Sequence, residues 1–143
     1  MLLNKTTKIE IQDVTTNYRV STGIAAKGDK ETVLMIRKRI MENTKEELAK
    51  RSIDAFTEYT EGAARLKYDI RTLDSGYRLI GTGYAVIGKD KYEVKYKVTL
   101  ESPEGKKLWD DTDEQDDSDL DDVLSKIASR VAKKVSRYYK DNQ

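Results

Sequence analysis

Apolar and polar side chains alternate strictly in two parts of the chain. Residues 92–100 carry Tyr, Val and Leu at every second position, with Lys95 and Lys97 between them. Residues 64–70 repeat the pattern, with Arg65 and Lys67 at the polar positions. Because successive side chains of a strand point to opposite faces, this alternation predicts antiparallel strands with one buried face and one face in water.

Two further segments read as strands. Residues 8–12 place Ile9 and Ile11 on one face, and residues 18–20 can resume this strand after the polar break at residues 15–17. Residues 53–57 allow a short strand whose register the sequence leaves open. Glycines punctuate residues 23–28 and 77–88, which we expect to be connecting segments.

Two helices follow from apolar spacings of three and four. The first is capped by Asp29, ends near residues 50–51 and has the apolar stripe Val33, Ile36, Ile40, Thr44 and Leu48. The second is preceded by a capping-box pattern, Ser118 with Asp121, and has basic residues in its last turns, which suits the helix dipole. Its stripe is Leu120, Val123, Leu124, Ile127, Val131 and Val135.

A turn and an acidic run lie between the last strand and the last helix. Pro103 and Gly105 predict a tight turn that folds residues 106–110 back as a hairpin, with Trp109 anchored on the sheet. Residues 110–122 are dense in Asp and Glu, and we expect them to form a solvated connection into the helix.

These elements together predict an α+β fold, a small mixed, mostly antiparallel sheet with two long helices packed on it. The 143 residues are a common size for one domain, so we expect residues 1–143 to form a single domain. The chain contains no apolar run long enough to cross a bilayer, and we expect no direct membrane insertion of this domain.

Composition narrows the chemistry. Lys and Arg number 27 and Asp and Glu 26, so the net charge of +1 provides no overall field to attract nucleic acid or an anionic membrane. Cys and His are both absent, which removes thiol and imidazole catalysis and metal ligation by these residues. We therefore expect no enzyme activity, no catalytic residues and no cofactor; only an enzyme using carboxylates alone stays open, because the spacing of such a pair is spatial.

Two motifs fail as ligand sites. A calcium loop that starts at Asp111 would need Gly at its sixth position and Glu at its twelfth, where the chain has Asp116 and Asp122. The glycines at 81, 83 and 88 lack nucleotide-loop spacing and lead into a strand. We expect no metal site, and a bulge or close backbone crossing at the glycines.

Basic residues and tyrosines are the remaining candidates for binding. Helical spacing spreads the basic residues of both helices over several faces and acids interrupt them, so we expect solvated helix faces and no nucleic-acid binding. The basic residues are residues 37–39, Lys133, Lys134, Arg137 and Lys140, with Tyr138 and Tyr139 beside them. The chain has nine tyrosines and one Phe, and Tyr is enriched at contacts with partners. The candidate partner contacts are Tyr77, Gly81, Gly83 and Tyr84.

The order of several short segments carries a resemblance to a known family. They are residues 8–13, the helix from Glu31, residues 66–70, 78–83 and 94–100, residues 105–109 and the closing helix at 127–132. In this order the chain resembles a family of bacterial envelope lipoproteins of unknown function, related in architecture to LpoB, the CsgG core and the N-terminal domain of TolB.

The resemblance implies a non-enzymatic module that binds other proteins of the envelope. We expect a protein partner and a periplasmic or envelope location, with a leader and lipid-attachment cysteine upstream of Met1, since the sequence contains neither. The alternative is a cytoplasmic adaptor or inhibitor, such as a mobile element could encode. The DNA upstream of the codon for Met1 would distinguish the two.

Overall fold

Two helices and five strands make up the described part of the chain, which covers residues 7–20, 29–74 and 92–142 of a computed structural model. In chain order the elements are β1 (Lys8–Val20), α1 (Asp29–Ala49), β2 (Asp54–Phe56), β3 (Ala64–Asp74), β4 (Tyr92–Glu101), β5 (Lys107–Asp117) and α2 (Leu120–Asp141). This content confirms the α+β class.

The strands form one mixed sheet in the order β2-β1-β3-β4-β5. β1 pairs in parallel with β2 and with β3, whereas β3, β4 and β5 form antiparallel pairs. Most of the paired residues therefore lie in antiparallel ladders, as the alternating patterns predicted.

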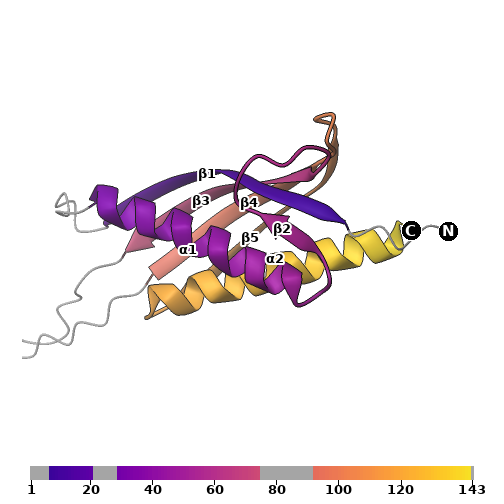
Figure 1. Ribbon diagram of the computed structural model, residues 1–143. Helices are drawn as coiled ribbons and strands as arrows, with labels where there is room; N and C mark the ends of the chain where they lie inside the picture. The colour runs from indigo at the N-terminus through magenta and orange to yellow at the C-terminus, as the bar shows by residue number, and fades with distance from the viewer. Residues whose placement is uncertain (1–6, 21–28, 75–91, 143) are drawn as a thin grey trace, which may run out of the picture.

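Both helices lie on one face of the sheet and contact each other (Figure 1). α1 packs over β1 and β2, and α2 packs over β4 and β5. The alternating positions predicted to face inward form the core with the helical stripes, and the strand residues Ile9, Ile11, Leu66, Ile70, Val94, Val98 and Leu100 are fully buried. The opposite face of β4 carries exposed Lys95 and Lys97, as expected.

β1 continues through the segment that the sequence indicated as a break. A register shift between Gln12 and Thr15 inserts an extra residue relative to β3. Before the shift Ile9 and Ile11 face the helices; after it, Thr16 pairs with the buried Ile70. Such a bulge changes the parity of a strand, which is why one strand can present odd and then even positions to the core.

The turn between β4 and β5 follows the prediction. Ser102 accepts a 2.8 Å hydrogen bond from the backbone N–H of Gly105 and donates its own N–H to Lys106 O at 2.7 Å. Gly105 has a φ of 91°, a conformation that side chains with a Cβ rarely adopt. The Pro-Glu-Gly sequence therefore fixes a tight hairpin.

Two buried polar contacts tie other elements to the sheet. The hydroxyls of Tyr68 on β3 and Thr44 on α1 lie 2.8 Å apart inside the core. On the other face of the sheet, the carboxylate of Glu10 accepts a 2.5 Å hydrogen bond from the backbone N–H of Thr60. Glu10 is only 5% exposed, so this bond and one from the Gln12 amide replace the water it would otherwise bind.

Two predictions for the C-terminal third were wrong in detail. The first part of the acidic run is not a connection: β5 continues from Lys107 to Asp117. The N-cap of α2 is Asp119, whose side chain accepts from the N–H groups of Asp121 and Asp122, and not Ser118. The longer strand is accompanied by ion pairs between its acids and cations of α2. Ser118 instead bonds to Asp117 through its N–H and hydroxyl groups, which leaves the cap to Asp119.

Candidate binding site at the last strand and helix

β5 presents two different rows of side chains to its surroundings. Its pairing with β4 places one row opposite the buried residues of that strand, so this row faces α2. The row consists of Trp109, Asp111, Asp113, Gln115 and Asp117. The other row, on the open face of the sheet, contains the exposed residues Asp110, Thr112, Glu114 and Asp116.

The row that faces α2 is held by ion pairs. Lys126 binds Asp117 with 2.8 Å between Nζ and Oδ2, and Arg130 binds Asp113 at 3.3 Å. Lys134 binds Asp111 and also lies 3.8 Å from Asp113. The three cations follow one another at intervals of four, which places them on one stripe of the helix. We call these contacts the β5–α2 ion-pair ladder.

The ladder explains why an acidic segment forms a strand beside the core. Without the cations, the carboxylates that face α2 would be partly desolvated at low dielectric and would repel one another. Tyr96, which pairs with Asp113, shows the effect of this environment, since burial and the nearby carboxylate raise its pKa to about 12. Its hydroxyl is buried and has no hydrogen-bond partner among the described residues.

The ion pairs of β5 should make the free energy of unfolding depend on pH. The hydrogen bond from Lys126 lowers the pKa of Asp117 below the usual 3.8, and the bond from Lys107 lowers the pKa of Asp110. A carboxyl group with a lowered pKa in the folded chain contributes stability above its unfolded pKa and loses it as the pH falls through the folded value. We therefore expect the urea midpoint to fall between pH ~5 and pH ~2, and Asp117→Asn to reduce this loss.

The control for this acid titration is Glu104→Gln in the exposed turn, where no ion pair is formed among the described residues. Both variants are followed by circular dichroism in urea at several pH values. An acid dependence that Asp117→Asn and Glu104→Gln change equally would contradict a role for the ladder.

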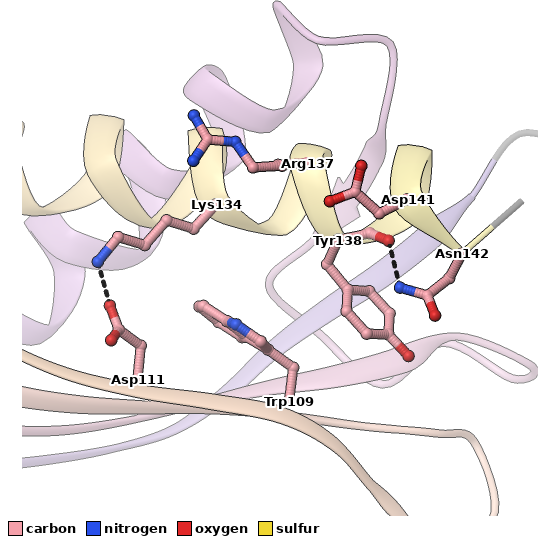
Figure 2. Close-up of a pocket in the computed structure, with 7 residues that line it drawn as sticks. All are labelled: Trp109, Asp111, Lys134, Arg137, Tyr138, Asp141 and Asn142. Atoms are coloured by element: carbon pink, nitrogen blue, oxygen red, sulfur yellow. Dashed lines mark hydrogen bonds and ion pairs between the residues drawn. The ribbon is translucent and has the colours of Figure 1, made fainter.

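A groove lies beside the first part of β5, between that strand and the last turns of α2 (Figure 2). Its volume is about 370 Å³. Trp109 and Tyr138 supply half-buried aromatic side chains, and both pack against the core. The polar lining consists of Asp111, Lys134, Arg137, Asp141 and Asn142.

The last turns of α2 fix the shape of the groove. Tyr138 and Tyr139 contact each other edge to face with 5.4 Å between their ring centroids. Asn142 donates from its side chain to the carbonyl of Tyr138 at 2.8 Å, a bond drawn in Figure 2. Burial raises the pKa of Tyr139 to about 12, because the surroundings disfavour the charged phenolate. Of the residues in these contacts, Tyr138 and Asn142 line the groove.

A second hollow, of about 450 Å³, borders the middle of β5. Its lining includes Glu114 from the open face, Gln115 from the face toward α2, and Arg130 of the ladder. Residues from both faces of one strand line a single hollow only at the edge of the sheet. β5 has one strand partner, β4, among the described residues, and its other edge carries no paired strand in that part of the chain.

The structure also locates the other candidates from the sequence. Tyr77, Gly81, Gly83 and Tyr84 lie outside the described residues. Two residues of the suggested basic surface are engaged with acids: Lys134 in the ladder, and Arg39, which lies 3.6 Å from Asp121. The described residues contain no group of three or more Asp and Glu placed to hold a metal ion.

Comparison with solved structures shows the fold. A crystal structure from Helicobacter pylori, described as a homolog of neuraminyllactose-binding hemagglutinin, matches with a TM-score of 0.52 and 8% identity over 94% of this chain and 82% of the other. A crystal structure of an uncharacterized protein matches with a TM-score of 0.50 and 10% identity over 92% and 90%. A minor lipoprotein from Acinetobacter baumannii matches with a TM-score of 0.46 and 11% identity over 91% and 92%.

Comparison by sequence gives no relative. No protein-family model matches the chain, and no curated protein matches it. The protein therefore has an α+β fold, and solved structures share this fold at low sequence identity. Within the described residues neither helix is long and apolar enough to span a bilayer.

Proposed function

We propose that this chain is a non-enzymatic protein-interaction module of the bacterial cell envelope, and that it binds an extended, basic segment of a partner along the outer edge of β5, where the described residues place no paired strand. The observation that carries the proposal is the edge itself, an 11-residue strand with acids on both faces. The resemblance of the chain to envelope lipoproteins, in the order of its sequence segments, supports the location.

The geometry of β5 suits the addition of a strand. An edge strand offers unpaired N–H and C=O groups, and a partner that adds a strand gains affinity from the backbone and specificity from alternate side chains. In the described part of the chain, β5 is long for an edge strand. The ion-pair ladder fixes its inner row, so the edge needs no rearrangement before binding.

Charge selects the partner. On the open face an added strand would meet Asp110, Thr112 and Glu114, of which Asp110 already pairs with Lys107 at 2.9 Å. Opposite charges across neighbouring strands stabilise a sheet and like charges destabilise it. Pairing of β5 with β5 from a second copy of this chain is therefore disfavoured, and a segment with Lys or Arg at alternate positions is favoured.

The test uses three synthetic peptides labelled for fluorescence anisotropy. We expect a blocked peptide of alternating Lys and Thr to bind, and the same peptide with Glu for Lys not to bind. The Lys-Thr peptide with every backbone nitrogen methylated has the same charge but has no N–H group to donate to a β-ladder, and we expect it not to bind. Equal binding of the Lys-Thr peptide and its N-methylated form would contradict strand addition, because it would leave only charge attraction.

A pair of variants locates the site on the chain. Glu114→Lys should weaken binding of the Lys-Thr peptide about fivefold, since one cross-strand attraction becomes a repulsion. Glu104→Lys changes the net charge by the same amount in the exposed turn outside the strand. Equal weakening by both variants would show that the peptide senses net charge and not β5.

The envelope location has its own test. The native gene, expressed with its own upstream sequence and followed by fractionation, should place the protein with the cell envelope. Recovery in the cytoplasmic fraction alone would contradict the location and favour the cytoplasmic adaptor.

A further inference from the structure

We infer that the groove between β5 and the end of α2 is a second binding site, and that its ligand is a neutral sugar ring of an oligosaccharide. The lining of the groove combines aromatic side chains with carboxylates, which accept hydrogen bonds, and with cationic side chains, which donate them (Figure 2). This second site does not depend on the edge of β5 binding a partner.

The aromatic side chains provide the first part of such a site. Trp109 and Tyr138 come from β5 and from α2, and both line the groove while the core supports them from behind. A pyranose ring has an apolar face made of C–H groups, and aromatic rings are the side chains that cover such a face at low entropic cost. The close-up in Figure 2 shows that Trp109 lies between Asp111 and Tyr138, beneath α2.

The polar lining selects a neutral ligand. Asp111 is neutralised by Lys134, and Arg137 and Asp141 supply one further charge of each sign. An anion in the groove would meet the carboxylate of Asp141, and a cation would meet the guanidinium of Arg137. A sugar hydroxyl both donates and accepts, so it can use a carboxylate, an amide and a guanidinium at once.

Size agrees with this ligand. A cavity volume of about 370 Å³ falls in the range of small-molecule sites, and the groove is open at the surface, so a longer chain can pass beyond it.

The test uses the protein's own fluorescence, because Trp109 is its one tryptophan and lies in the groove. The full chain is titrated with N,N′,N″-triacetylchitotriose, cellotriose and maltotriose, three neutral trisaccharides of different linkage and substitution. We expect a saturable change of the tryptophan emission with at least one of them. Absence of a saturable change with all three would overturn the inference.

Two variants on α2 decide whether the groove is responsible. Arg137→Ala removes an exposed donor that forms no ion pair among the described residues, and it should weaken the binding about fivefold or more. Lys133→Ala removes an exposed charge of the same helix that does not line the groove, and it should leave the titration unchanged. Equal effects of both variants would overturn the assignment to the groove.

Discussion

Replacing Leu124 with alanine should lower the free energy of unfolding by about 2–5 kcal/mol, the largest effect we expect from a single substitution in this chain. Leu124 lies on the stripe of α2 that faces the sheet and is fully buried. The substitution removes apolar contacts and leaves a cavity, and both terms destabilise the folded chain. Urea denaturation followed by circular dichroism measures the change.

The matched control is Leu34→Ala on α1. Leu34 is 62% exposed, so the same chemical change removes little buried surface and should cost less than about 0.5 kcal/mol. If the two variants lost similar stability, α2 would not form the main cover of β4 and β5, and the packing described above would be incorrect.

The second large effect is expected from deleting a single hydroxyl. Tyr68→Phe removes the partner of the buried Thr44 hydroxyl, and leaving such a group unsatisfied costs about 1–3 kcal/mol. Burial of the phenol also raises the pKa of Tyr68 above its usual value, because the core disfavours the charged form. The measured quantity is again the free energy of unfolding in urea.

Tyr96→Phe is the matched comparison on the neighbouring strand. The Tyr96 hydroxyl is buried but has no hydrogen-bond partner in the described part of the chain, so its removal should leave stability unchanged or increase it. The double variant Tyr68→Phe with Thr44→Val should recover part of the lost free energy of unfolding, because the buried Thr44 hydroxyl is then removed and is not left without a hydrogen bond. Equal destabilisation by Tyr68→Phe and Tyr96→Phe would show that the Tyr68–Thr44 bond contributes nothing.

The helices and the inner strands were predictable because each has a local period. The stripe of α2 recurs every three or four residues, and all its predicted members are buried. The alternation in β3 and β4 matches the observed burial in the same way. These patterns can be read from the sequence because one face of each element packs against the core, and that face recurs with the period of the helix or strand.

The candidate site was not predictable by the same means. β5 has apolar residues only at its start, so its acids read as a solvated run, and its strand conformation depends on Lys126, Arg130 and Lys134 from a different element. One signal was present in the sequence. The spacing of two between Asp111 and Asp113 suits a strand, and the spacing of four between the cations suits one helix stripe.

The parity change in β1 illustrates a similar limit. Between Ile11 and Tyr18 the sequence has Val14 as its one apolar residue, and a single apolar position does not show where the parity of a strand changes. Pairing with β3 decides that Thr16 faces inward beside Ile70. The groove is a further example, since Trp109 and Tyr138 come from elements that are adjacent only after the sheet and α2 have packed.

The amino-acid sequence by itself determined the class of fold, the two amphipathic helices, the inner strands and the tight turn at Gly105, because each follows from side chains within a few residues of one another. The tertiary structure alone decided that the acidic run is an edge strand, that its carboxylates bind the cations of α2, and that a groove forms beside Trp109. These depend on charges and surfaces brought together by packing, and a local pattern of polar residues does not specify which distant partner will meet it.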